Sequence, residues 1–192
     1  IEYTEEIGEA AFYGPKLDIH IKDSLGRVWQ CGTVKLDMNL PERFGATYVD
    51  SEGKKQTPIM LHRVVYGSIE RFIGILIEHF GGHFPLWLAP QQFVVIPVHQ
   101  EKHLDYAKKV VEALKAQGMR VQLDDRNEKL GYRVREAQMK KVPYQIVVGD
   151  GEMENETVTI RKSGSKESTT VALQEALEKF AKEVEEKCLF NK

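Results

Sequence analysis

The chain has 192 residues, enough for two compact domains, and 42% of them are hydrophobic while 29% are charged. This balance excludes an intrinsically disordered chain, and the formal net charge of -2 excludes a globally basic nucleic-acid binder while leaving room for a local basic patch. The most apolar stretch, residues 64–80, is interrupted by Glu70, Arg71 and Glu78, so no membrane-spanning segment is predicted.

Cysteine usage and the start of the chain indicate the setting in which the protein works. Cys31 and Cys188 are far apart and form neither a disulfide framework nor a CxxC metal pair, which suits a reducing compartment. Together with the absence of a recognisable signal peptide, this predicts a cytoplasmic protein. The chain starts at Ile1 directly in patterned sequence, so we expect it to be a piece of a longer protein.

The first part of the chain is predicted to form antiparallel strands followed by one helix. Residues 17–22 alternate apolar and polar side chains, as a half-buried strand does. Further strands are expected at 27–36, 44–49 and 58–65. From Ser68, a candidate N-cap, apolar residues recur every three or four positions up to Gly81, which predicts a helix over 68–80.

The second part alternates strands and helices, and a Pro-rich and aromatic segment places the domain boundary near Pro90. Strands are expected at 93–98, 120–123 and 144–148, helices at 102–117, 130–141 and 172–187, and a hairpin from 156–161 and 168–171. We therefore predict domains at 1–90 and 91–192 and an α/β fold class. The first domain would be an antiparallel sheet with a helix, and the second a compact α/β domain with a mixed sheet.

Three stretches of the first part resemble the end of the catalytic domain of threonyl-tRNA synthetases. They read FYGPK from Phe12, WQCGTVKLD from Trp29 and LHRVVYGSIERFIGIL from Leu61. The last resembles motif 3 of class II aminoacyl-tRNA synthetases, in which a strand, a turn of small residues and a helix carry an arginine. In the second part, residues 125–136 (DRNEKLGYRVRE) resemble the class IIa anticodon-binding domain.

This resemblance implies a threonine–tRNA ligase. Such an enzyme activates threonine with ATP and Mg²⁺ to threonyl-adenylate and then transfers the threonyl group to tRNA(Thr). The resemblance also implies that the complete enzyme, from which this chain would be a piece, is a homodimer and binds neither membranes nor DNA. Two other class II motifs are absent from this chain: the dimerisation helix of motif 1 and the motif 2 loop, which carries another ATP-binding arginine. We therefore expect the fragment alone to be inactive.

The resemblance also assigns residues to the threonine and ATP site. Arg71 matches the motif 3 arginine that binds ATP, a role that suits a permanently charged, planar guanidinium. Lys16 matches a position where a cation offsets developing charge. The remaining contacts to threonine or ATP fall on Tyr13, Gln30, Thr33 and Ser68. Because neighbouring strand residues face opposite ways, Cys31 is expected to pack while Gln30 contacts the nucleotide.

His62, just before motif 3, matches one of three zinc ligands in the family. There the amino group and hydroxyl of threonine coordinate Zn²⁺, which separates threonine from valine, whereas a hydrophobic pocket distinguishes such near-isosteres only by about 100-fold. One ligand cannot hold zinc tightly, so we expect this fragment not to retain the metal. A substitute site made of His20, Cys31 and His62 is disfavoured.

The second part carries a predicted basic stripe, and within it the resemblance marks RNA contacts. The stripe comprises Arg126, Lys129, Arg133, Arg135, Lys140 and Lys141. The residues that match anticodon-contacting positions are Asn127, Arg135, Glu152 and Arg161. Amide and guanidinium groups suit the exposed edges of single-stranded bases, and Lys129 and Lys141 would meet phosphates.

Two other interpretations stay open at this point. One is a non-catalytic, synthetase-like module that binds RNA or has a regulatory role. The other is a class IIa synthetase for another amino acid, such as proline, glycine, serine or histidine. The position of His62 favours threonine over these.

Overall fold

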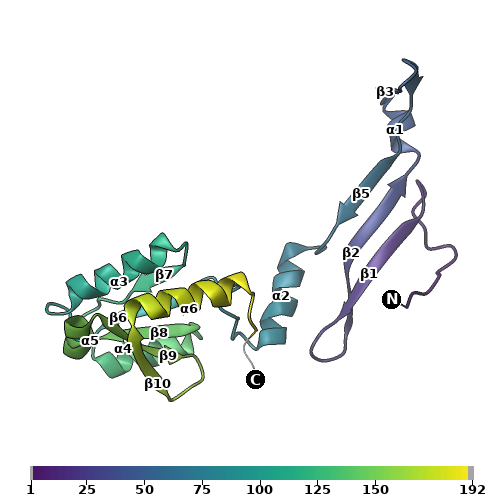
Figure 1. Cartoon of the computed structure of the whole chain (residues 1–192). Helices are drawn as coiled ribbons and strands as arrows, with labels where there is room; N and C mark the ends of the chain where they lie inside the picture. Colours follow the sequence, from purple (N-terminus) through teal and green to yellow (C-terminus); the bar gives the residue numbers. More distant parts are fainter. Residues whose placement is uncertain (1, 190–192) are drawn as a thin grey trace. The chain divides into compact units, whose positions relative to one another are not determined.

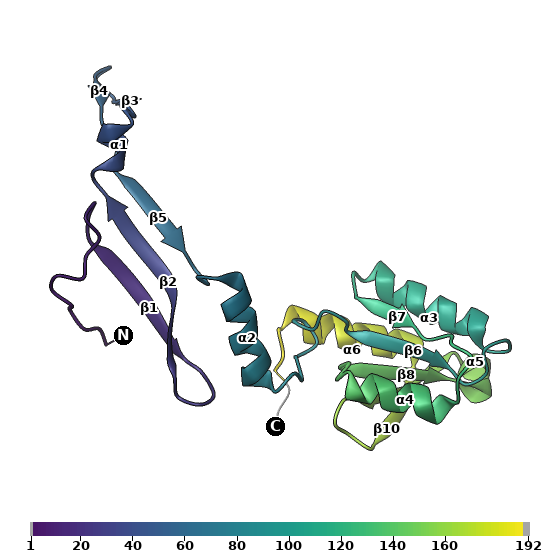
Figure 2. The same cartoon turned by 180° about the vertical axis from the view of Figure 1, so that it is seen from behind.

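The computed structural model describes residues 2–189, which form two compact units divided between His79 and Phe80. Figures 1 and 2 show the two units from opposite sides. The predicted domain boundary near Pro90 remains a prediction. Residues 81–92 contribute buried side chains to the second unit, among them Leu86 and Ala89. None of the described helices combines the length and apolarity that a bilayer span requires.

The first unit is built around a three-stranded antiparallel sheet in the order β1-β2-β5. These strands are β1 (Lys16–Lys22), β2 (Val28–Asp37) and β5 (Met60–Val64), and they confirm three predicted strands. Helix α2 (Ile69–Phe80) follows β5 and confirms the predicted helix. The Ser68 hydroxyl accepts the backbone N–H of Arg71 at 3.4 Å, the bond expected of an N-cap residue.

The predicted strand at 44–49 is wrong over most of its length. Helix α1 (Leu40–Arg43) precedes it, and only Tyr48–Val49 form a strand, β3, which pairs with β4 (Lys55–Gln56). Pro41 suits the first turn of α1, and Gly45 has a positive φ of 61° that breaks any strand there. The Asp37 carboxylate fixes the entry to α1 by accepting the N–H groups of Asn39 and Leu40.

The second unit is an α/β domain around a five-stranded mixed sheet in the order β10-β9-β8-β6-β7. Its elements are β6 (Phe93–Pro97), α3 (Leu104–Ala116), β7 (Val121–Leu123), α4 (Leu130–Met139), β8 (Tyr144–Val148), α5 (Asp150–Asn155), β9 (Thr157–Lys162), β10 (Ser168–Ala172) and α6 (Leu173–Glu185). Strand β6 runs parallel to β7 and β8, whereas β9 and β10 are antiparallel to their neighbours. All predicted elements are present, and only α5 was missed.

The two faces of this sheet are covered differently. Helices α3 and α6 pack on one face through an apolar cluster that includes Phe93, Ile146 and Phe180. Helix α4 packs on the other face through a smaller cluster around Val94 and Ile96. Figure 2 shows β6 and β8 between α3 and α4. The larger cluster supplies most of the buried apolar area and therefore most of the stability of this unit.

Candidate functional site

One face of the sheet in the first unit gathers polar side chains. Paired residues on antiparallel strands point to the same face, and the register pairs Lys35 with both Lys16 and His62. The next position along pairs Thr33 with Asp18 on one side and Val64 on the other. Three predicted site residues, Lys16, Thr33 and His62, therefore lie on one face.

A β-bulge at Cys31 adds Gln30 to this polar face. Ile19 pairs with Gly32 while the next residue, His20, pairs with Gln30, so Cys31 is the extra residue on β2. Without it, Gln30 and Thr33 would face opposite sides. Instead, the Gln30 amide lies 3.1 Å from the Thr33 hydroxyl. Cys31 is buried, which confirms that it packs.

Asp18, which sequence reasoning missed, holds three predicted residues together. Its Oδ1 accepts hydrogen bonds from the Gln30 amide at 2.6 Å and the Thr33 hydroxyl at 2.7 Å, and its Oδ2 lies 3.0 Å from Lys16 Nζ. Burial opposes ionisation of Asp18, but these donors hold its pKa below the ordinary value. The same contact raises the pKa of Lys16. A fixed charge pair thus orients the polar groups of this face.

His62 is held in a similar way by Asp37, a second residue that sequence reasoning did not single out. His62 Nε2 lies 2.9 Å from Asp37 Oδ2, and the Asp37 side chain is fully buried. Burial opposes its ionisation, but the N–H of Leu40 and the contact with His62 lower the pKa of Asp37. An ionised carboxylate only accepts, so Nε2 donates and the Nδ1 lone pair is left available.

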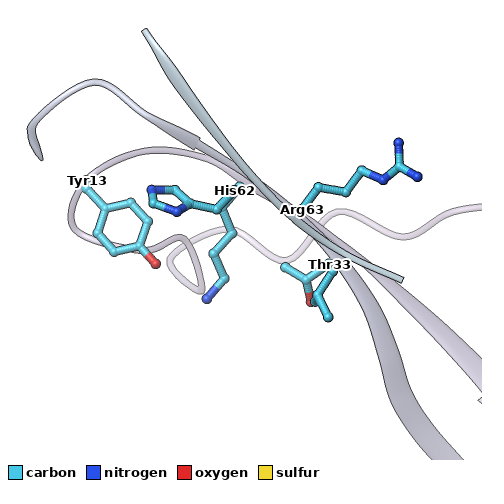
Figure 3. A pocket seen from close by; sticks show the side chains of 6 residues that line it. Tyr13, Thr33, His62 and Arg63 are labelled. Carbon is cyan, nitrogen blue, oxygen red and sulfur yellow. The ribbon is translucent and has the colours of Figure 1, made fainter. Parts of the chain in front are cut away.

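A hollow of about 320 Å³ opens beside His62 and is lined by Tyr13, Thr33, Lys35, His62, Arg63 and Val64. Figure 3 shows the Tyr13 ring beside the imidazole, while the Arg63 side chain extends away from both. The ring centroids of Tyr13 and His62 are 6.1 Å apart. The backbone that carries Tyr13 is fixed close to β2, because a Cβ on Gly14 would lie 2.1 Å from the carbonyl oxygen of Leu36.

Of the side chains around this hollow, His62 is the one that could bind a metal ion. Among residues 2–189 no three His, Cys, Asp or Glu side chains are grouped so that they could hold an ion. His62 nevertheless has the form of a metal ligand, because a buried carboxylate holds one of its nitrogens and orients the ring, as is usual for metal-bound histidines. The environment of His62 therefore suits a single metal ligand.

Arg71 lies apart from this hollow and is connected to the polar face through Gln30. Its Nη1 donates to the Gln30 carbonyl oxygen at 3.3 Å, at the edge of β2. Gly67 makes this approach of α2 to β2 possible. It has a positive φ of 68°, and a Cβ there would lie 2.7 Å from the Cys31 carbonyl oxygen. The glycine before the helix is thus required by packing against the bulge.

In the second unit, the predicted basic stripe needs a correction. Arg133 is fully buried and donates to the carbonyl oxygens of Asp124 and Pro97, both at 2.8 Å, so it cannot contact RNA phosphates. Arg126 is paired with Asp124 and Glu136, and Lys140 with the same Glu136. The apolar spacing of Leu130, Val134 and Ala137 places position 133 on the buried side of α4, a signal that was available in the sequence.

Glu152 and Arg161 lie on the same face of the mixed sheet as α4, in a part of that face that α4 does not cover. Val158 and Ile160 point into the larger apolar cluster, so Thr159 and Arg161 point the opposite way. Glu152 accepts the Thr159 hydroxyl at 2.6 Å and the Gly149 N–H at 2.9 Å, which fixes it over β9. Its pKa is lowered by these bonds against the effect of burial. Glu152 and Arg161 therefore share one polar surface.

Asn127 occupies the loop between β7 and α4, which internal hydrogen bonds hold in place. The Gln100 amide donates to the Arg126 carbonyl oxygen at 2.8 Å, and Arg133 Nε donates to that of Glu128 at 3.1 Å. In the sheet, β6 and β8 lie between β7, which precedes the loop that carries Asn127, and β9, which carries Arg161. Arg135 is exposed on α4.

Comparison with known proteins identifies the family. Residues 2–80 match the family model "tRNA synthetase class II core domain (G, H, P, S and T)", and residues 92–183 match "Anticodon binding domain". The chain is 54% identical over 189 residues to the threonine–tRNA ligase of Caldanaerobacter subterraneus subsp. tengcongensis, which covers 98% of this chain. It is 51% identical over 191 residues to that of Clostridium tetani, which covers 100% of it. The chain belongs to the threonyl-tRNA synthetase family. It spans 29% and 30% of the lengths of these two relatives.

Solved structures agree with this membership in the threonyl-tRNA synthetase family. The RNA-binding domain of threonyl-tRNA synthetase from Cryptosporidium parvum superposes with a TM-score of 0.81 at 36% identity, over 91% of this chain and 44% of that one. The prolyl-tRNA synthetase of the same organism, in complex with L-proline and AMP, gives 0.71 at 26% identity, over 94% and 39%. The prolyl-tRNA synthetase thus shares the fold, while sequence identity favours the threonyl-tRNA synthetases.

Proposed function

We propose that the complete protein is a threonine–tRNA ligase in which this chain supplies part of the ATP and threonine site and the anticodon-reading domain. Threonine would displace pyrophosphate from ATP to form threonyl-adenylate, and the threonyl group would then pass to the 3′ end of tRNA(Thr). The observation that carries the proposal is the polar face on which Asp18 and Asp37 orient Lys16, Gln30, Thr33 and His62.

Each of the proposed site residues, on this face or near it, has a role that suits its chemistry. Lys16 and Arg71 are cations that offset the charge of the phosphates, which Mg²⁺ accompanies. Gln30 and Thr33 offer polar groups at fixed positions for the nucleotide, and Ser68 lies at the N-terminus of α2 beside Arg71. The Tyr13 hydroxyl can hydrogen-bond the amino acid.

His62 would supply one ligand to a zinc ion that recognises threonine. When bound, the metal coordinates the hydroxyl of threonine and so rejects valine. Asp37 holds the imidazole by Nε2, which leaves Nδ1 as the donor atom. The remaining ligands would come from parts of the protein outside this chain.

Amino-acid-dependent ATP–pyrophosphate exchange by the full-length protein tests the activity. Threonine should support exchange, while valine and proline, which lack the side-chain hydroxyl, should not. His62→Ala should abolish both exchange and bound zinc. His20→Ala is the matched control and should leave both unchanged, because His20 lies on the same sheet and pairs with no carboxylate among residues 2–189. Full zinc content in His62→Ala would refute the role of His62.

The anticodon function can be tested on the chain itself. Asn127, Arg135, Glu152 and Arg161 would contact bases, and Lys129 and Lys141 would meet phosphates. Asn127→Ala and Arg135→Ala should each weaken binding of a tRNA(Thr) anticodon hairpin about tenfold, the effect of one lost base contact. Lys108→Ala on α3 is the control. Equal affinity of all four proteins would contradict the assignment.

Two further outcomes concern the parent protein. A full-length protein that binds the hairpin but exchanges pyrophosphate with no amino acid would be a non-catalytic RNA-binding module. The proposed homodimer is checked by the sedimentation of the full-length protein, where a monomer would contradict it.

A further inference from the structure

The Trp29 side chain lies on the face of the first sheet opposite to the polar face, and it contacts both the β1–β2 turn and Arg71. It pairs with Ile21, whose face is opposite to that of Gln30. The Arg27 and Arg71 guanidinium carbons lie 5.6 and 5.9 Å from the centroid of its ring. Both distances are within the range of cation–π attraction. One indole therefore contacts two arginines.

The indole is itself fixed by Asp23. Its N–H donates to Asp23 Oδ2 at 2.8 Å, and the Asp23 side chain is fully buried. Asp23 also accepts the backbone N–H groups of Leu25 and Arg27, both at 2.9 Å, and the Arg27 Nε. Burial opposes ionisation, but these four donors hold the pKa of Asp23 well below its ordinary value. The ring thus has a rigid anchor at the β1–β2 turn.

The two arginines on this ring differ in their charge balance. Arg27 is paired with Asp23 and with Glu78 of α2, so its charge is neutralised. Arg71 forms no ion pair with any of residues 2–189; its contacts are the Trp29 ring and the Gln30 carbonyl oxygen. A ring and a carbonyl hold the guanidinium in place without cancelling its charge, and most of its N–H donors remain available.

We infer that Trp29 is a positioning residue for Arg71: its indole, anchored by Asp23, holds the guanidinium at the edge of β2 in the orientation that binds the phosphates or base of ATP. This inference rests on the proposed role of Arg71 in ATP binding. Preorganisation lowers the cost of ordering a long side chain when the ligand binds. The opposite possibility is that the ring holds Arg71 in a resting position from which ATP must displace it.

Binding of ATP to the full-length protein, measured by equilibrium dialysis and by ATP–pyrophosphate exchange, decides between these two. Trp29→Leu should raise both the Kd and the KM for ATP about three- to tenfold and leave the KM for threonine unchanged. Trp29→Phe keeps a smaller aromatic face and should have an intermediate effect. Arg43→Gln is the control, because it removes an exposed arginine of the same unit that does not contact the Trp29 ring, and it should change the Kd less than twofold.

A double-mutant cycle separates positioning from general damage. In an Arg71→Ala background, Trp29→Leu should have no further effect on ATP binding, because the residue it positions is gone. An equal loss in both backgrounds, or tighter ATP binding by Trp29→Leu, would overturn the inference. If Trp29→Leu fails to fold, the Trp29→Phe cycle gives the same comparison.

The experiments distinguish a failure of the proposed ligase function from a failure of the proposed role of Trp29. A wild-type protein that binds ATP but catalyses no threonine-dependent exchange would refute the ligase, and the dialysis series would still decide the role of Trp29. A wild-type protein that binds no ATP would refute both.

Discussion

Replacing Arg133 by methionine tests whether one buried arginine stabilises the second unit. The Arg133 guanidinium ties three segments together by donating to the carbonyl oxygens of Pro97, Asp124 and Glu128 at 2.8, 2.8 and 3.1 Å. Methionine fills similar space but has no donor, so these buried acceptors would lose their partner. The loop that carries Asn127 would lose one of its ties at the same time.

The size of the effect follows from two opposing contributions. A hydrogen bond that involves a charged group contributes about 1.5–3 kcal/mol, and Arg133 makes three short ones. Removing the buried charge also removes its desolvation cost, which offsets part of this loss. We expect a net decrease of about 3 kcal/mol in the free energy of unfolding, roughly a 150-fold change in the folded-to-unfolded ratio.

Arg135→Met is the matched control, since it removes the same charge from an exposed position two residues along α4. Surface changes of this kind stay within about 0.5 kcal/mol. The assay is urea unfolding followed by tryptophan fluorescence. The chain has two tryptophans, so a Trp29→Phe background leaves Trp87 to report on the second unit. Equal midpoints for Arg133→Met and Arg135→Met would refute the assignment of Arg133 as a structural anchor.

Three further predictions concern stability. Residues 80–189 produced alone should unfold cooperatively in urea, because both apolar clusters lie in this unit; a non-cooperative transition would contradict this. Gln145→Met should raise the free energy of unfolding by about 1–3 kcal/mol, because both polar atoms of the fully buried amide lack a partner among the described residues; a loss of stability would show that the amide is satisfied in solution. Asp23 has a lowered folded pKa, so its stabilising contribution is present above its unfolded pKa of about 3.9 and is lost as the pH falls toward the folded value. Fluorescence of Trp29 in a Trp87→Phe background should therefore show a decline in stability below about pH 4 that is smaller in Asp23→Asn.

Most elements were predictable because their signals are local. Alternation predicted β1, and apolar spacing predicted α2 and α3. Helix α5 was missed because its six residues, Asp150–Asn155, contain a glycine and no apolar period. The strand expected at 44–49 failed because Pro41 and Gly45 shape a short helix and turn there, which outweighs the aromatic residues nearby.

The way the site is assembled was less predictable, because it depends on pairing between distant segments. Resemblance pointed to Lys16, Gln30, Thr33 and His62 but not to Asp18. Its role depends on the register that brings β1 beside β2. The bulge at Cys31 has the same origin, since one strand alone does not reveal an unpaired residue.

The face of the first sheet opposite the polar face carries apolar side chains that are largely exposed. Alternation therefore predicted the strand correctly but did not indicate how stable the sheet is. Leu17 and Ile19 of β1 and Leu61 of β5 occupy the apolar positions of the pattern, yet each is at least 51% exposed. Among the described residues of this unit only Cys31 and Ile75 are buried hydrophobic side chains. Such a sheet has a defined register but little buried apolar area to offset the loss of chain entropy. Residues 2–79 produced alone should therefore lack a cooperative unfolding transition by circular dichroism, and a sharp transition would show that the polar networks of Asp18, Asp23 and Asp37 suffice to hold the unit together.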